Sequence, residues 1–117
     1  MKKPNIAIIG LGYVGLPLAI EFGKHFTTSG FDFKDKINLL KKNFDPNYQI
    51  NKKDFLKSKN LNFLYDFKLL NNFDFIIVTV PTPINNKNIP NLLPLKNACI
   101  KIGSNIKKNT TIIFEST

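Results

Sequence analysis

Three closely spaced glycines, Gly10, Gly12 and Gly15, form the pattern in this sequence that most clearly points to chemistry. They directly follow the apolar run 6–9 and precede a segment with helical periodicity. Between a strand and a helix, the first glycine permits a tight turn, the second lets the backbone approach a pyrophosphate, and the third lets the helix pack closely. The start of the helix adds N–H donors and a partial positive charge. The pattern therefore predicts a turn that binds the pyrophosphate of a dinucleotide.

An acidic residue, Asp32, follows these glycines at close to the ~20-residue spacing expected of a carboxylate that binds the ribose of a dinucleotide. Its oxygens can accept hydrogen bonds from the ribose hydroxyls, and its charge would repel a 2′-phosphate. This favours NAD over NADP as the ligand. The alternative is an aspartate that ends a strand and caps the next helix. Because the glycines precede it, we favour the ribose role.

Hydrophobic periodicity predicts strands and helices in alternation around these residues. The runs 5–10 and 74–80 are almost entirely apolar, as is typical of parallel strands that are buried on both faces. Proline follows the second run directly and prevents the strand from continuing. The other expected elements are strands at 27–32, 62–65 and 111–115, helices at 13–25, 34–43, 53–59 and 95–106, and a helical turn at 66–71.

Helical spacing also predicts which side chains are buried. In the first expected helix, Val14, Leu18 and Phe22 recur every four residues, and we expect them to form one buried stripe with Ala19. In the last expected helix, the single cysteine, Cys99, falls on the apolar stripe. We therefore expect an inert, buried thiol rather than a nucleophile. A single cysteine also excludes an internal disulfide and agrees with a reducing compartment.

The alternation of strands and helices predicts an α/β fold. We expect a Rossmann-like, doubly wound parallel sheet, incomplete, with about five strands in the order 3-2-1-4-5 and helices on both faces. Ligands of such sheets bind at the carboxyl ends of the strands, in the crevice where the strand order reverses. Three segments should meet there, 10–15, 80–83 and 115–117. The adenosine should lie toward the second strand, and the nicotinamide toward Thr82 and Thr117.

Length and composition exclude several classes of protein. The 117 residues, 43% of them hydrophobic, suit one globular domain with a core. No apolar stretch approaches the ~20 residues of a membrane span, and the start of the chain does not fit a signal peptide. We therefore expect a cytoplasmic protein with no membrane partner. No group of His and Cys has the spacing of metal ligands, so we expect no metal site.

The net charge of +9 raises the possibility of a nucleic-acid partner. All 17 basic residues are lysines, and they are scattered along the chain. Arginine, which is the preferred residue for bidentate recognition of phosphates and bases, does not occur. A solvated basic surface is therefore favoured over a nucleic-acid site.

Four motifs occur in a fixed order along the chain: Ile-Gly-Leu-Gly-Tyr-Val-Gly-Leu-Pro-Leu-Ala at 9–19, Gly-Phe-Asp at 30–32, Val-Pro-Thr-Pro at 80–83 and Glu-Ser-Thr at 115–117. Together they resemble the N-terminal NAD-binding domain of the UDP-glucose/GDP-mannose dehydrogenase family. The resemblance spans nearly the whole chain. It is nearest to the branch that oxidises UDP-N-acetylhexosamines, such as UDP-N-acetylgalactosamine or UDP-N-acetylmannosamine.

This resemblance implies NAD as the cofactor. In complete members of the family, it implies two successive oxidations of a nucleotide-sugar C6 hydroxyl to a carboxylate, in homo-oligomeric enzymes of surface polysaccharide or capsule synthesis. It implies that Thr117 lies by the nicotinamide and helps to position the attacking water. The implied cofactor-binding residues are Gly10, Gly12, Tyr13, Val14, Gly15, Asp32, Lys36, Pro81, Thr82 and Thr117.

The resemblance also implies that much of the enzyme lies outside residues 1–117. The family's catalytic cysteine, lysine and asparagine, its central helix and its sugar-binding domain follow this segment, and Cys99 does not match the catalytic cysteine. We therefore expect the NAD-binding Rossmann domain of a longer enzyme, inactive by itself. The alternative is a non-enzymatic remnant or NAD-binding module. The polar Thr27-Thr28-Ser29, where the family has an apolar second strand, motivates this alternative.

Overall fold

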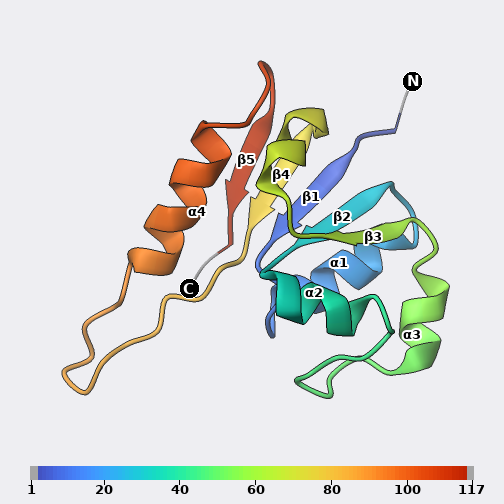
Figure 1. The fold of residues 1–117 in the computed structure, drawn as a ribbon, viewed down its shortest axis with the longest axis horizontal. Helices are drawn as coiled ribbons and strands as arrows, with labels where there is room; N and C mark the ends of the chain where they lie inside the picture. Colours follow the sequence, from blue (N-terminus) through green and yellow to red (C-terminus); the bar gives the residue numbers. More distant parts are fainter. Residues whose placement is uncertain (1–2, 116–117) are drawn as a thin grey trace.

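The computed structural model describes residues 3–115 and shows a five-stranded parallel sheet with helices on both faces (Figure 1). The strands are β1 (Ile6–Ile9), β2 (Thr28–Phe31), β3 (Leu61–Leu64), β4 (Phe75–Val78) and β5 (Thr111–Phe114). The helices are α1 (Gly15–Gly23), α2 (Lys34–Leu40), α3 (Lys52–Lys57) and α4 (Leu93–Gly103), with a 3₁₀ helix η1 (Phe67–Asn72) before β4. Every expected element is present, with its ends shifted by a few residues.

The strand order is β3-β2-β1-β4-β5, which confirms the predicted doubly wound topology. The chain begins in the middle of the sheet, runs outward to β3, and then crosses back to place β4 beside β1. The strand order therefore reverses between β1 and β4. The carboxyl ends of these two strands border the crevice in which such sheets bind ligands.

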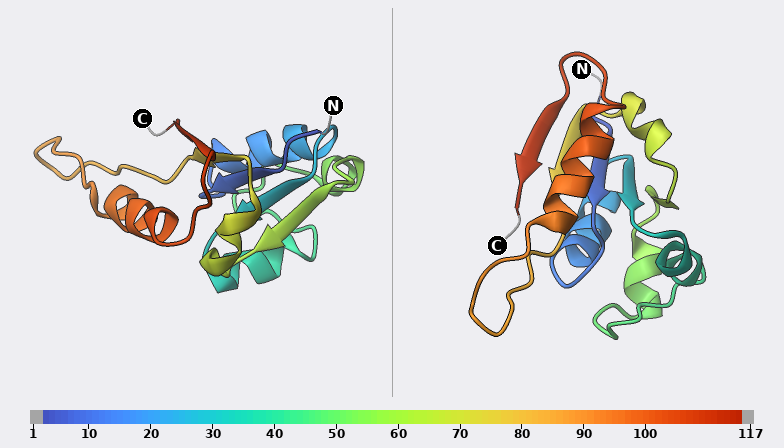
Figure 2. Two further views of the ribbon diagram at one scale, coloured as in Figure 1. Left: turned by 90° about the horizontal axis from the view of Figure 1, so that it is seen from above. Right: turned by 60° about the vertical axis from the view of Figure 1, so that its left-hand side comes forward.

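Alternate residues of the strands feed two separate cores, because successive side chains of a strand point to opposite faces. Ile6 and Ile8 of β1 pack with residues of α1, α2 and α3 on one face. Ala7 and Ile9 pack with residues of η1 and α4 on the other. Figure 2 shows α1 and α4 on opposite sides of the sheet. Burial on both faces explains why β1 reads as a continuous apolar run.

The buried stripe of α1 differs from the expected one. Val14 is 51% exposed, so the prediction that it is buried was wrong, and Leu18 and Phe22 are only partly buried. Ala19 is buried as expected, and the buried face is completed by Leu16, Ile20 and the glycines at both ends of the helix. These residues also recur at helical spacing. Because glycine and alanine are small, this face can approach the sheet more closely than a face of larger side chains.

The prediction that Cys99 is buried was also wrong, although the predicted apolar stripe of α4 does pack against the sheet. Its side chain is exposed, whereas Ala98 and Ile102 are the residues that α4 buries. Only a narrow stripe of α4 therefore packs against the sheet. Successive residues of a helix are rotated by about 100° around its axis, so the neighbour of a buried residue can already lie outside such a stripe. The residue next to Ala98 consequently faces solvent, as does Ile100, which is 67% exposed.

The polar second strand is compatible with burial in this fold. Thr28 and Ser29 are buried, and the Thr28 hydroxyl donates a hydrogen bond of 2.9 Å to the Phe26 carbonyl. Gly30 leaves room for the side chain of Leu11, whose methyl carbons would lie 2.9 Å from a Cβ at this position. The strand therefore satisfies a hydroxyl locally and accommodates the residue that follows Gly10. Within residues 3–115, no helix has the length and apolar character needed to cross a membrane.

Candidate functional site

Gly10 ends β1 in a conformation that favours glycine. Its φ is +95°, and a Cβ at this position would lie 2.9 Å from both the N and the Cα of Val80. The Gly10 amide donates to the Phe31 carbonyl at 2.9 Å, which ties the turn to the end of β2. The turn therefore begins where β1, β2 and the residue pair after β4 meet. A side chain at Gly10 would force these backbones apart.

The two other glycines of the turn have opposite surroundings. A Cβ on Gly15 would collide with the Gly10 carbonyl oxygen and the Thr79 hydroxyl, and would lie 2.9 Å from the Gly10 carbonyl carbon. A Cβ on Gly12 would meet no protein atom within 4 Å. Gly15 is thus required by the packing of α1 against the strands. Gly12 leaves its backbone open to a ligand.

The first turn of α1 is suited to an anion. The N-cap residue is Val14, whose hydrocarbon side chain cannot accept a hydrogen bond from the helix amides, and the first turn contains no acidic residue. The Leu16 and Leu18 amides donate to the Gly12 and Val14 carbonyls at 3.1 and 3.3 Å, and Pro17 has no N–H. What this helix end offers an anion is therefore mainly its partial positive charge. Tyr13 and Val14 are 69% and 51% exposed, so this end of α1 is accessible.

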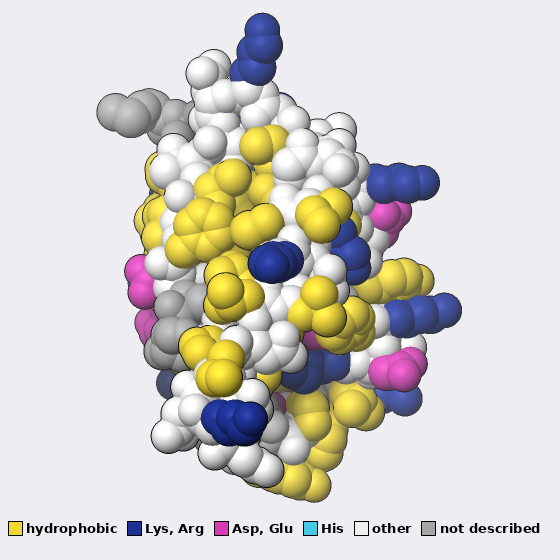
Figure 3. Space-filling model, turned by 90° about the vertical axis from the view of Figure 1, so that its left-hand side faces the viewer, with side chains coloured by type: hydrophobic (Ala, Val, Ile, Leu, Met, Phe, Trp, Pro, Cys, Tyr) yellow, Lys and Arg dark blue, Asp and Glu magenta, His cyan; other side chains and the backbone are white. Residues whose placement is uncertain are grey.

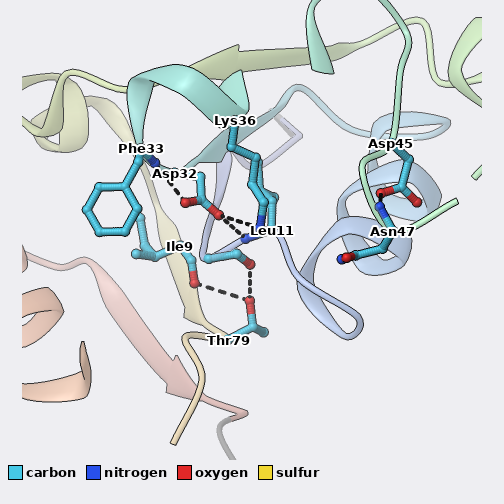
Figure 4. A network of polar contacts seen from close by, with 9 residues as sticks. Ile9, Leu11, Asp32, Phe33, Lys36, Asp45, Asn47 and Thr79 are labelled. Atoms are coloured by element: carbon cyan, nitrogen blue, oxygen red, sulfur yellow. Dashed lines mark hydrogen bonds and ion pairs between the residues drawn. The ribbon is translucent and has the colours of Figure 1, made fainter. Parts of the chain in front are cut away.

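The Asp32 carboxylate lies at the end of β2 and is held by two backbone amides (Figure 4). Oδ2 accepts from the Leu11 N–H at 2.8 Å, and Oδ1 accepts from the Phe33 N–H at 2.7 Å. The Lys36 ammonium is 3.5 Å from Oδ2, and the Asp32 side chain is 12% exposed. Each carboxylate oxygen has a second lone pair, so the group can still accept a ligand hydroxyl. Phe33, not Asp32, is the N-cap of α2, so Asp32 does not cap this helix as the alternative supposed.

A cavity of about 430 Å³ adjoins this carboxylate. Gly10, Asp32 and Pro81 line it together, although they come from three distant parts of the chain. Opposite Asp32, the cavity is lined by α4 and the segment before it. On this side of the molecule, hydrophobic side chains gather between separate lysines (Figure 3). The volume of the cavity is within the range of small-molecule sites, and its wall is mostly apolar. The cavity therefore offers an apolar surface beside a hydrogen-bond acceptor.

Some lining residues were not anticipated from the sequence. Phe33 is 76% exposed and directly follows Asp32, a position that could have marked it. The Lys101 ammonium of α4 lies 4.5 Å from the ring centre of Phe67 and 5.8 Å from that of Phe33. These cation–π contacts connect α4 to the segments beside β2 and β4. No local pattern in the sequence predicts that Lys101 lines the cavity, because its partners Phe33 and Phe67 are distant along the chain.

Thr79 is a further residue that the sequence analysis passed over. Its side chain is buried, and its hydroxyl donates to the Gly10 carbonyl at 2.6 Å. One signal was available, since Thr79 is the polar residue within the apolar run 74–80 that lies nearest the predicted crevice.

The remaining predicted site residues are distributed around the crevice. Within residues 3–115, Gly12, Tyr13, Val14, Gly15, Lys36 and Thr82 do not line the cavity. Lys36 pairs with Asp32, and Thr82 is partly buried beside Pro81. Thr117 lies outside the described residues. Of the residues that the structure describes, no group of three or more His, Cys, Asp or Glu could hold a metal ion.

Comparison with known proteins points to one family. Residues 4–117 match the model of the UDP-glucose/GDP-mannose dehydrogenase family, NAD binding domain. The chain is 41% identical over 118 residues to a UDP-N-acetyl-D-glucosamine 6-dehydrogenase of Pseudomonas aeruginosa, an alignment that covers 100% of this chain and 28% of that protein.

Solved structures are similar over the same region. The native UDP-N-acetyl-mannosamine dehydrogenase Cap5O of Staphylococcus aureus has a TM-score of 0.78 and 30% identity, over 97% of this chain and 29% of that one. A ternary complex of GDP-mannose dehydrogenase from Pseudomonas aeruginosa has a TM-score of 0.87 and 25% identity, over 96% of this chain and 28% of that one. The chain thus spans less than a third of the length of these relatives.

Proposed function

Because this chain belongs to the UDP-glucose/GDP-mannose dehydrogenase family and forms its NAD-binding domain, we propose that it is the cofactor-binding part of a nucleotide-sugar 6-dehydrogenase. One observation carries the proposal: an open glycine turn, a carboxylate and an apolar cavity lie next to one another where the strand order of the sheet reverses. These are the three surfaces that the pyrophosphate, the ribose and the adenine of NAD need.

The residues present fit this cofactor. Gly12 and the first turn of α1 would hold the pyrophosphate, because the backbone is unobstructed there and the helix end attracts anions. Asp32 would accept a hydroxyl of the adenosine ribose, and Lys36 beside it would keep the carboxylate in place. Phe33 would form part of the apolar wall against the adenine. Tyr13 and Val14 would contact the cofactor from the exposed end of α1.

The nicotinamide would lie across the crevice from the adenosine. Pro81 and Thr82 follow β4, whose carboxyl end borders the crevice. In the same proposal, Thr117 helps to position a water at the nicotinamide. When bound, NAD supplies the hydride acceptor for the reaction. This domain contributes by binding and orienting the cofactor against a sugar that other segments must hold.

The reaction proposed for the whole enzyme is a two-step oxidation of a UDP-sugar C6 hydroxyl to a carboxylate. The 41% identity to a UDP-N-acetyl-D-glucosamine 6-dehydrogenase supports an N-acetylhexosamine as the sugar. The relatives are more than three times longer than the matched segment, which supports the assignment of sugar binding and of the catalytic cysteine to further segments. We place the enzyme in the cytoplasm, in surface polysaccharide synthesis, as a homo-oligomer.

Calorimetric titration of the 117-residue chain with NAD tests the cofactor role. We expect saturable binding of NAD and weaker binding of NADP, because Asp32 repels a 2′-phosphate. Circular dichroism on the same sample establishes that it is folded. Absence of NAD binding in a folded sample would refute the proposal. A longer chain that includes the sugar-binding part should reduce NAD with UDP-N-acetylglucosamine faster than with UDP-glucose, measured by absorbance at the wavelength of NADH.

A further inference from the structure

One peptide group of the glycine turn, the Gly10–Leu11 peptide, is held at both of its ends. On one side, the Thr79 hydroxyl donates to the Gly10 carbonyl oxygen at 2.6 Å. On the other side, the Leu11 N–H donates to Asp32 Oδ2 at 2.8 Å. The C=O and N–H of a trans peptide point in opposite directions, and no cis peptide occurs within residues 3–115. The Thr79 hydroxyl after β4 and the Asp32 carboxylate after β2 therefore form hydrogen bonds to opposite sides of the same peptide group (Figure 4).

The Thr79 hydroxyl has little choice of partner. It carries one proton, and the two nearby acceptors are the carbonyls of Ile9 at 3.1 Å and Gly10 at 2.6 Å. The Ile9 carbonyl already accepts the Thr79 backbone amide at 2.8 Å. The side chain is buried, so water does not compete for the proton. The Gly10 carbonyl is the nearer of the two acceptors, so the hydroxyl proton is directed mainly at it.

We propose that Thr79 is a positioning residue for NAD, which acts through the Gly10–Leu11 peptide on Asp32. By fixing the Gly10 carbonyl, it directs the Leu11 N–H at the carboxylate and holds this group where the ribose binds. The chain of donors and acceptors is cooperative, because each hydrogen bond polarises the next one. The inference rests on the proposed role of the domain in NAD binding.

A merely structural threonine would behave differently. If the hydroxyl of Thr79 had only a structural role, its removal would lower the free energy of unfolding but would not specifically change the affinity for NAD. A positioning residue should instead affect the NAD dissociation constant, and its effect should depend on the presence of Asp32. Thr79→Val removes the hydroxyl at nearly constant volume, and Thr79→Ser keeps the hydroxyl. This pair separates the donor from the packing.

The test is a double-mutant cycle for NAD binding, measured by calorimetry with Thr79→Val, Asp32→Ala and the double variant. Thr79→Val should raise the NAD dissociation constant by about five- to tenfold, as expected for one lost hydrogen bond. Thr79→Ser should restore it to within about twofold of the unaltered protein. In the Asp32→Ala background, Thr79→Val should change the constant by less than about twofold, because its target is absent. The Leu11 amide proton signal should also move upfield in Thr79→Val as its hydrogen bond weakens.

The outcomes distinguish a failure of this proposal from a failure of the proposed function. If the unaltered chain binds NAD and Thr79→Val binds it equally well, or if Thr79→Val weakens binding equally with and without Asp32, the proposal is wrong. If Thr79→Val does not fold, Thr79→Ala takes its place in the cycle with the same expectations, because it removes the hydroxyl without placing a methyl group against the Gly10 carbonyl. Failure of the unaltered chain to bind NAD refutes the proposed function instead. The Leu11 signal still reports, without any ligand, whether Thr79 controls the peptide.

Discussion

Alanine substitutions at Gly12 and Gly15 should damage this protein in two different ways. The two glycines belong to the same turn and differ from alanine by the same methyl group. A Cβ at Gly15 collides with the Gly10 carbonyl oxygen and the Thr79 hydroxyl, whereas a Cβ at Gly12 meets nothing within 4 Å. Gly15→Ala should therefore destabilise the fold, and Gly12→Ala should weaken NAD binding with the fold intact.

The size of the stability effect follows from what the new methyl group meets. At Gly15, the obstacle includes backbone, with the Gly10 carbonyl carbon at 2.9 Å, and backbone cannot rotate away as the end of a side chain can. Overpacking of this kind costs about 3 kcal/mol at the upper end of the usual range. For a domain of this size, that corresponds to a fall of roughly 10 °C in the melting temperature.

At Gly12, the stability effect should be small and can have either sign. The added methyl group meets no protein atom, and the backbone is outside the left-handed region that disfavours alanine. Loss of glycine freedom in the unfolded chain can even stabilise by about 0.5 kcal/mol. The methyl group would, however, occupy the space through which the pyrophosphate approaches. We expect the NAD dissociation constant to rise by about tenfold or more, equivalent to about 1.4 kcal/mol.

The assay is thermal unfolding by circular dichroism, with and without NAD, combined with calorimetric titration. NAD at about 100 times its dissociation constant should stabilise the unaltered chain by about 2.7 kcal/mol, and this gain should shrink in Gly12→Ala. The unaltered melting temperature without NAD is the common control. A Gly12→Ala variant that binds NAD normally, or a Gly15→Ala variant that melts normally, would contradict the reasoning at that glycine.

Four further predictions concern single side chains. Asp32→Ala should raise the NAD dissociation constant by about 10- to 100-fold, since hydrogen bonds to a charged group are lost, and equal affinity in calorimetry would refute the ribose assignment. Phe33→Ala should weaken NAD binding by about fivefold with little change in melting temperature, because Phe33 is 76% exposed. Cys99 should react with Ellman's reagent in the native protein as completely as in the unfolded chain, because its side chain is exposed; protection would restore the buried assignment. Asp45→Ala should lower the free energy of unfolding by about 3 kcal/mol in urea titrations, as Asp45 is 3% exposed and accepts amides of Asn47, Gln49 and Ile50; an unchanged midpoint would contradict this.

Local patterns were sufficient to predict the order of the elements. The apolar runs that became β1 and β4 are buried on both faces, so their character does not depend on which helix covers them. The glycines and Asp32 are also close enough in the chain to be interpreted as one unit. Helix faces were harder to predict. In α1 the packed face is shifted from the predicted stripe, so Val14 is exposed although Ala19 is buried. In α4 the predicted stripe does pack through Ala98 and Ile102, and Cys99 lies at its exposed edge.

The sequence by itself determined the fold class, the family and the cofactor, because the strand–turn–helix pattern and Asp32 express backbone requirements that are local to the chain. Only the tertiary structure decided how the crevice is built. Thr79 reaches the Gly10 carbonyl across 69 positions, and Lys101 of α4 reaches Phe67 and Phe33 from a different part of the chain. Such contacts depend on strand register and on the exact placement of helices, which no short stretch of sequence encodes.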